Sequence, residues 1–305
     1  MVSTRTPPTR RGSSRPTVLR SLVKAARPGQ WLKNGLVLAA PVAAGALFGR
    51  DVLLATALAF ISFCLASSSG YLVNDTVDRE VDRAHPTKRT RPLAAGTLSP
   101  VVAVSVALVL AVASLGLAAI VSRGLVLAVG AYLVLALSYS LGLKHQPVLD
   151  LGVVTGLFVV RAVAGGVAAD LPISQWFLIV SAFGSLFLVS GKRYSELVLL
   201  GDDAAAARPS LAHYTGTYLR FVWGVAAGVA VTAYCLWAFE VGEGGASAPW
   251  AALSVAPFVI ALLRYARDID SGRAGAPDQI ALHDRVLQVL VLVWGALFSL
   301  EAFGV

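Results

Sequence analysis

Nine long apolar stretches, separated by shorter charged segments, are the feature that most constrains the fold of this chain. Hydrophobic residues make up 57% of its 305 residues and charged residues only 14%, a balance typical of integral membrane proteins. A spanning helix needs about 20 mostly apolar residues, and no β-barrel alternation is present. The sequence therefore predicts an all-α integral membrane bundle of nine transmembrane helices, at about 34–49, 54–73, 101–121, 124–142, 148–168, 174–190, 218–240, 249–266 and 285–303.

The positive charges indicate how this bundle is oriented. With the N-terminus in the cytoplasm, the inner segments are 1–33, 74–100, 143–147, 191–217 and 267–284. Together with their flanks they hold 22 of the 25 Lys and Arg residues, and the positive-inside rule favours this orientation. The sequence thus predicts a multi-pass protein of the cell membrane with a cytoplasmic N-terminus. The net charge of +8 fits this topology and anionic substrates rather than nucleic acid, because no soluble basic domain is present.

The chain divides into two parts before any function is considered. Residues 1–20, rich in Arg, Pro, Ser and Thr, are predicted to form a disordered basic arm. Residues 21–305 are predicted to form a single membrane domain. An interfacial helix within 17–33 is expected where the arm joins this domain. On that helix the residues expected to point inward are Leu19, Leu22, Val23 and Trp31, while Arg20, Lys24 and Arg27 would point toward headgroups. The first apolar stretch is short and is interrupted by Asn34, Gly35 and Pro41.

An oxygen-bearing stripe follows the second apolar stretch, on the predicted cytoplasmic side. Its members are Asn74, Asp75, Asp78 and Asp82. At about 100° per residue on a helix, the four fall within about 100° of one another. Such oxygens are ligands that Mg²⁺ takes when it also binds substrate phosphates, and acids beside a spanning segment are costly unless they serve a function. All four are predicted to hold Mg²⁺, with the three aspartates as catalytic residues.

Cations crowd the loop after this stripe, where Arg83, Lys88, Arg89 and Arg91 follow one another. Acids that gather a metal beside cations that gather phosphate suit a diphosphate-bearing substrate, because Arg binds phosphate oxygens in forked pairs. Alternatively, any single Arg of this loop is a residue that only follows the positive-inside rule.

Two further features point to anion binding. If 191–196 continue as a helix, Lys192 and Glu196 share a face. Lys192 is then expected to hold a phosphate, while Glu196 positions Lys192 or accepts hydrogen bonds from hydroxyl groups. The alternative is a simple i,i+4 ion pair. Arg161 lies within the fifth span, where it costs ~2.5–3.5 kcal/mol unless it faces a polar cavity or pairs with an acid. An anion-binding role is favoured for it.

Several motifs resemble a known superfamily. The pattern Asn-Asp-x-x-Asp-x-x-x-Asp at 74–82, and Arg27–Asn34 before the first span, are similar to intramembrane UbiA-type prenyltransferases, from about residue 20 onward. Within that superfamily the resemblance is closer to the phosphoribosyltransferases that act on decaprenyl phosphate. The similar segments are 71–75, 85–89, 142–146, 191–194 and 218–223.

The resemblance implies an activity. Such enzymes transfer 5-phosphoribose from phosphoribosyl pyrophosphate to a polyprenyl phosphate lipid, release pyrophosphate, and feed cell-wall arabinan synthesis. Superfamily members usually carry a second Asp-rich motif between the sixth and seventh spans. Here that loop has Lys192, Arg193, Tyr194 and Glu196 instead, which favours the phosphoribosyl donor and leaves the number of Mg²⁺ ions open.

The residues divide by expected role on this interpretation. Candidates for binding the donor phosphates and sugar are Lys33, Lys144, Arg161, Lys192 and Tyr194, with Glu196 beside them. Candidates for the lipid phosphate are Arg83, Lys88, Arg89 and Arg91.

Two alternative functions stay open at this point. A UbiA-type aromatic or quinone prenyltransferase would use the same acids on a prenyl diphosphate. A secondary transporter would show broken helices and inverted repeats near the midplane, whereas the charges here crowd one face. The sequence leaves open the prenyl length and whether the chain forms a homo-oligomer.

Overall fold

The structure is a computed structural model that describes residues 17–85, 87–201, 209–243, 249–273 and 283–304. Its described part is all-helical, as predicted, and has no strand. The long helices are α3 (Arg50–Val77), α5 (Pro100–Val121), α6 (Arg123–Leu141), α7 (Leu149–Ala168), α8 (Gln175–Leu200), α10 (Gly216–Glu243), α11 (Trp250–Asp270) and α13 (Arg285–Ala302). Among the described residues, all of these except α11 belong to the seven helices that are long and apolar enough to cross a membrane. The predicted number of nine spanning helices is therefore not confirmed.

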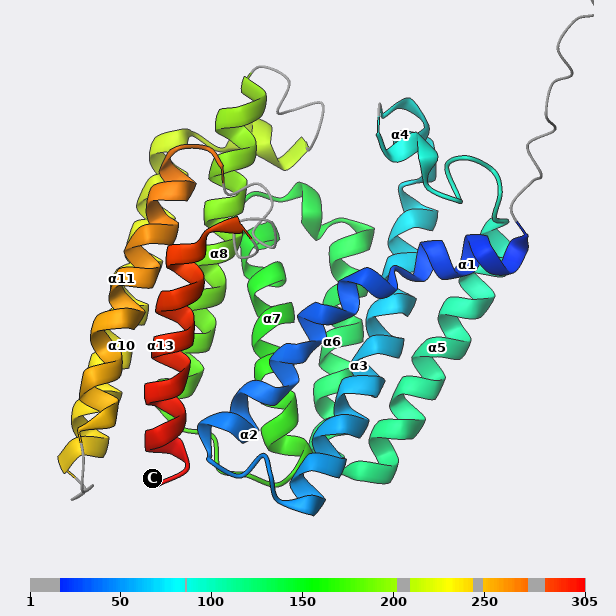
Figure 1. Cartoon of the computed structure of the whole chain (residues 1–305). Helices are drawn as coiled ribbons and strands as arrows, with labels where there is room; N and C mark the ends of the chain where they lie inside the picture. The colour runs from blue at the N-terminus through cyan, green and yellow to red at the C-terminus, as the bar shows by residue number, and fades with distance from the viewer. Residues whose placement is uncertain (1–16, 86, 202–208, 244–248, 274–282, 305) are drawn as a thin grey trace, which may run out of the picture.

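The first predicted span, 34–49, is not a regular α-helix. Its place is taken by the 3-10 helix η1 (Pro28–Leu38) and the short α2 (Ala39–Ala43). A 3-10 helix of 11 residues is unusually long, and Asn34, Gly35 and Pro41 account for the irregularity, since each weakens an α-helix interior. In Figure 1 this blue segment crosses the bundle obliquely, from α1 toward α2 at the other end.

A glycine pair in α7 allows the oblique segment to approach closely. A Cβ atom added at Gly165 would lie 1.9 Å from the backbone oxygen of Val37, and one at Gly166 would lie 3.1 Å from Cβ of Ala40. Small residues at a crossing let two backbones come together inside a membrane. The contact therefore places η1 and α2 directly against α7.

Arg161 stabilises the contact between η1 and α7 from inside the bundle. It is 4% exposed, and it donates hydrogen bonds to Asn34 Oδ1 at 2.8 Å, to the Tyr132 hydroxyl at 2.7 Å and to the Leu157 carbonyl at 2.8 Å. The guanidinium also lies 4.5 Å from the Tyr132 ring centroid. These partners link η1, α6 and α7. They are neutral, so the alternative of an acid partner for Arg161 is not what the described residues show.

Two packed halves share α7. One buried cluster joins η1, α3, α5, α6 and the second half of α7, with Phe63, Leu125 and Ala164 at its centre. The other joins the start of α7 to α8, α10, α11 and α13, with Leu151, Phe187 and Ile269. Many large apolar side chains, such as Leu108 and Leu292, are exposed on the outside, as expected for a surface that faces lipid.

The interfacial helix is shorter than expected. It is α1 (Val18–Ala26), with Ser21 and Ala25 buried against the protein and Leu19 and Val23 exposed. In Figure 1 it lies across one end of the bundle, the end that also carries α4 (Arg79–Ala84), and α2 lies at the opposite end.

We expect Gly165→Ala to destabilise the protein, because the added methyl group collides with the backbone of η1 and the crossing must open. The cost should be about 1–3 kcal/mol, measured as a lower midpoint of thermal unfolding in detergent. Gly152→Ala is the matched control in the same helix, since a Cβ there meets nothing within 4 Å. It should be neutral or slightly stabilising, and equal losses in both variants would contradict the close-approach argument.

Candidate active site at the charged end of the bundle

The predicted oxygen stripe is present, but a break in the helix interrupts it. Helix α3 ends at Val77, and Asp78, with φ −85° and ψ 0°, is the junction to α4. The Asp82 amide still donates to the Asp78 carbonyl at 2.8 Å, so the turn continues nearly in register. Asp75 and Asp82 are 1% and 3% exposed, while Asn74 donates to Asp78 Oδ2 at 3.1 Å. We call these four residues the acidic cluster.

Three cations from other segments neutralise the acidic cluster. Arg27 Nη2 lies 2.5 Å from Asp75 Oδ1, and Arg91 Nη1 lies 3.2 Å from the same oxygen and 2.7 Å from Asp82 Oδ2. Lys144 pairs with Asp78 and lies 3.5 Å from Asn74 Oδ1. The cluster thus joins the N-terminal segment, the loop after α4 and the link between α6 and α7. Arg91, predicted for the lipid phosphate, lies between two of the acids.

Arg27 is a site residue that the sequence analysis assigned to lipid headgroups. It ends α1 in the left-handed region, with φ 52°, and this turn sends its side chain over the Tyr71 ring, 5.0 Å from the centroid, to Asp75. The available signal was its place at the start of the Arg27–Asn34 motif. Amphipathic periodicity cannot show that a helix stops one residue earlier.

Arg83, the first cation of the loop, contacts an acid outside the acidic cluster. Arg83 pairs with Glu80 at 2.7 Å and donates to the Ala94 carbonyl at 3.2 Å. Lys88 is half-buried and Arg89 is exposed in η2 (Lys88–Thr90). The pKa of His85 is lowered by its desolvation and by the Lys88 charge, which favours a neutral ring here. Lys33 is likewise exposed, on η1.

A second polar cluster forms around α8 at the same end. Lys192 and Glu196 are 3.9 Å apart, as predicted for one helix face, and Arg193 Nη1 lies 3.4 Å from Glu196. Tyr194 is 5% exposed, and its hydroxyl accepts a hydrogen bond from Arg220 at 2.6 Å. Tyr194 is thus packed into the core at the edge of this cluster.

Sequence reasoning missed the acid at the centre of the second cluster. Asp150 is fully buried in the first turn of α7, 3.3 Å from Arg193 Nε. The signal was available, because an acid at the start of an apolar span is as costly as Asp75. Its partners, Arg193 and Tyr214, come from segments distant in sequence.

The donors of the acidic cluster fit Mg²⁺ chemically. They are carboxylate and amide oxygens, and Mg²⁺ commonly needs only one or two carboxylates when substrate phosphates supply the rest. In the described part of the chain no three His, Cys, Asp or Glu side chains lie together in a metal-holding group. The carboxylates are instead paired with cations: Asp75 with Arg27 and Arg91, Asp82 with Arg91, and Asp78 with Lys144.

Fold and site together define a class: a helical membrane protein with buried acids and cations gathered at one end. The model of the UbiA prenyltransferase family matches residues 35–285, and the chain belongs to this family. It is 52% identical over 288 residues to a decaprenyl-phosphate phosphoribosyltransferase of Mycobacterium tuberculosis, covering 93% of this chain and 95% of the relative. The same-named protein of Corynebacterium glutamicum is 51% identical, over 90% of this chain and 84% of its own.

Solved structures agree on the fold. A UbiA homolog from Archaeoglobus fulgidus bound to GPP and Mg²⁺ superposes with a TM-score of 0.68, over 93% of this chain and 98% of the other, at 19% identity. The predicted all-helical, UbiA-like fold class is therefore confirmed.

We expect Arg91→Gln to destabilise the protein, because it leaves Asp82 buried without its cation. Since Arg91 is itself 27% exposed at the side chain, we expect a loss of about 1–3 kcal/mol in the free energy of unfolding, less than for a fully buried pair. Arg89→Gln, an exposed position two residues away, is the control for thermal unfolding. If both variants unfold like the wild type, the Arg91 bridge contributes nothing to stability.

Proposed function

We propose that the chain transfers 5-phosphoribose from phosphoribosyl pyrophosphate to decaprenyl phosphate, giving decaprenylphosphoryl-5-phosphoribose and pyrophosphate for cell-wall arabinan synthesis. The observation that carries this proposal is the identity of about half the residues, over nine-tenths of the chain, to relatives named decaprenyl-phosphate phosphoribosyltransferase. The basic second cluster supports it, because Lys192 and Arg193 stand there and cations suit substrates that bring several phosphate groups.

The two substrates use different groups of residues in this proposal. Donor pyrophosphate lies at the acidic cluster, with Lys144, Lys192 and Glu196 around the donor phosphates and sugar, and Tyr194 and Arg161 holding the surrounding helices. The exposed Arg83 and Arg89 and the half-buried Lys88 bind the lipid phosphate at the membrane surface in this proposal, and the exposed Lys33 stays a candidate for the donor phosphates. Arg91, which lies between Asp75 and Asp82, neutralises these two acids until substrate enters.

Asn74, Asp75, Asp78 and Asp82 would hold Mg²⁺ in this enzyme. A bound Mg²⁺ would supply electrostatic stabilisation of the pyrophosphate leaving group. The protein's own groups orient donor and acceptor and exclude water, so catalysis rests on positioning and fixed charge. The acceptor phosphate oxygen attacks C1 opposite the leaving group. No protein base is required, because a phosphate monoester, with a second pKa near ~6, is already mostly dianionic at neutral pH.

The chain crosses the membrane nine times in this proposal, with the N-terminus and both clusters in the cytoplasm. The oblique η1–α2 segment and α11 provide the two crossings beyond the seven apolar helices. Lys and Arg residues support the orientation, since 22 of 25 lie in or beside the segments of that side.

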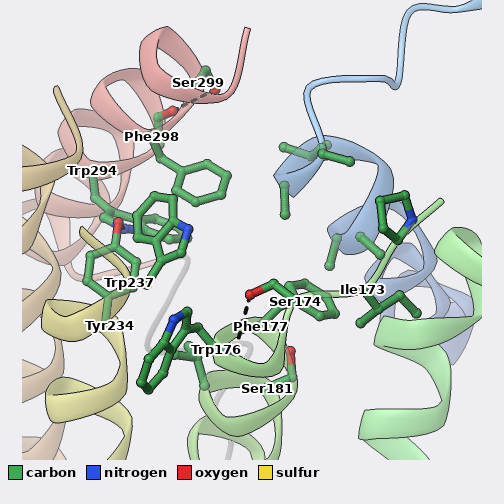
Figure 2. Close-up of a pocket in the computed structure, with 18 residues that line it drawn as sticks. Ile173, Ser174, Trp176, Phe177, Ser181, Tyr234, Trp237, Trp294, Phe298 and Ser299 are labelled. Atoms are coloured by element: carbon green, nitrogen blue, oxygen red, sulfur yellow. Dashed lines mark hydrogen bonds between the residues drawn. The ribbon is translucent and has the colours of Figure 1, made fainter. Parts of the chain in front are cut away.

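A cavity of about 360 Å³ suits the prenyl tail. It lies at the opposite end of the bundle, between α2, α8, α10 and α13, and Figure 2 shows Tyr234, Trp237, Trp294 and Phe298 facing it. Phe177 of this cavity is 15 residues from Lys192 on α8, or ~22 Å at 1.5 Å per residue. A decaprenyl chain, with about forty in-line carbon–carbon bonds of ~1.5 Å, reaches it readily.

The proposed activity is tested with purified protein, labelled phosphoribosyl pyrophosphate and decaprenyl phosphate, with and without Mg²⁺. Turnover should require both substrates and the metal. Asp78→Asn and Asp82→Asn should each lower kcat by about a thousandfold or more, as expected for groups felt in the transition state, while the protein stays folded in detergent. Near wild-type turnover of either variant at limiting Mg²⁺ would remove that residue from the site. Consumption of a prenyl diphosphate with an aromatic acceptor, and not of phosphoribosyl pyrophosphate, would favour the aromatic prenyltransferase instead.

Gly295→Leu tests the tail site, because Gly295 lines the cavity and a Cβ there meets nothing within 4 Å. The larger side chain takes up space in the cavity from a position whose Cβ meets no neighbour. We expect KM for decaprenyl phosphate to rise about three- to tenfold, a moderate effect because the tail leaves lipid rather than water. KM for geranyl phosphate, whose chain is too short to reach the cavity, should change little.

The matched control for this variant is Gly116→Leu, at an exposed position of α5 where a Cβ also meets nothing within 4 Å. It should leave both acceptors unaffected. If Gly295→Leu changes KM for both acceptors equally, or for neither, the tail leaves the bundle by another route.

A further inference from the structure

The buried carboxylate of Asp150 joins three segments of the charged end. It accepts hydrogen bonds from Arg193 Nε at 3.3 Å, from the Ser210 hydroxyl at 3.2 Å and from the Tyr214 hydroxyl at 2.5 Å. A fully buried carboxylate is tolerable only with such partners. Helix α7, helix α8 and the segment around η5 (Pro209–His213) therefore meet at one side chain.

Tyr214 connects this carboxylate to a backbone group. While its hydroxyl donates to Asp150, it accepts a hydrogen bond from the Val148 amide at 2.6 Å. Burial and the bond to Asp150 raise the pKa of Tyr214, so the hydroxyl keeps the proton that it donates. The Tyr214 hydroxyl oxygen is thus hydrogen-bonded both to Asp150, in the first turn of α7, and to Val148, just before this helix.

Val148 has a backbone conformation that needs support. Its φ of 67° and ψ of −48° are strongly unfavourable for a β-branched residue, and such strain persists only where surrounding contacts maintain it. The hydrogen bond to Tyr214 is such a contact. Val148 ends the short link that begins with η3 (Leu143–His145), and this link carries Lys144, the partner of Asp78.

We propose that Tyr214 is a positioning residue: its hydroxyl holds Val148 in the strained conformation and thereby keeps Lys144 in front of Asp78. Through Asp150 and Arg193 the same residue connects this link to Glu196 and the second cluster. Tyr214 therefore fixes the position of the acidic cluster relative to the second cluster. The kinetic consequence rests on the proposed function, whereas the placement of Lys144 does not.

The first measurement is independent of activity. The full-length protein in detergent is treated with a low concentration of acetic anhydride, and acetylation of Lys144 is followed by mass spectrometry, with Lys24 as internal reference. The Lys144 side chain is only 10% exposed and is paired. In Tyr214→Phe we expect its relative rate to rise roughly threefold or more, because the link opens locally. Tyr218→Phe is the matched control, since Tyr218 stacks on Tyr214 with centroids 5.8 Å apart and belongs to neither cluster.

The second measurement is a rescue. Glycine adopts positive φ without strain, so Val148→Gly removes the tendency of the link to relax. Tyr214→Phe combined with Val148→Gly should therefore recover part of the Lys144 protection. In turnover assays Tyr214→Phe should lower kcat more than it raises KM for decaprenyl phosphate, and the double variant should recover part of kcat.

Three results would overturn the proposal: unchanged Lys144 reactivity in Tyr214→Phe, an equal rise in Tyr218→Phe, or no recovery in the double variant. If the Lys144 pattern holds while the wild type fails to consume phosphoribosyl pyrophosphate, the positioning role stands and the proposed function is wrong.

Discussion

The pairing of buried carboxylates with cations from distant segments is the interaction on which the charged end of this structure depends. Asp75 and Asp82 lie beside an apolar bundle, where unpaired charges would be prohibitively costly, and Arg27 and Arg91 make their burial possible. The same pairs tie the N-terminal segment and the loop after α4 to the end of α3. In the proposed function, stability and substrate binding use one set of groups, because cations that neutralise the acids are also suited to bind phosphate.

The irregular η1–α2 segment likewise depends on close contacts with α7. Gly165 lets the backbone of η1 approach α7, and Arg161 then satisfies Asn34 across the gap. A regular helix at this position would place side chains where the backbone now lies. The crossing leads from Arg27 at the charged end to α2 beside the aromatic cavity, so it borders both proposed substrate regions.

Much of the candidate site could be predicted from the sequence because acids in an apolar context are conspicuous. The acidic cluster and the Lys192–Glu196 pair were found in this way, and the structure places both at one end. Arg27 was assigned to lipid headgroups, and Asp150 and Tyr214 had no assigned role. Their significance, like that of Arg193, comes from partners 43 to 64 residues away and from a left-handed turn at Arg27. Arg91 was assigned to the lipid phosphate, because proximity in sequence to other cations cannot reveal the two carboxylates that face it.

The sequence by itself determined that this is a helical membrane bundle, which segments are apolar, and which end gathers charge, because hydropathy and charge are properties of each segment alone. The family resemblance likewise came from short motifs. Only the tertiary structure decided how the first crossing is built, which cation neutralises which acid, and that Tyr214 stands between the two clusters. Those outcomes depend on distances between segments far apart in the chain, and on backbone turns such as those at Arg27 and Val148, which no local pattern of residues specifies.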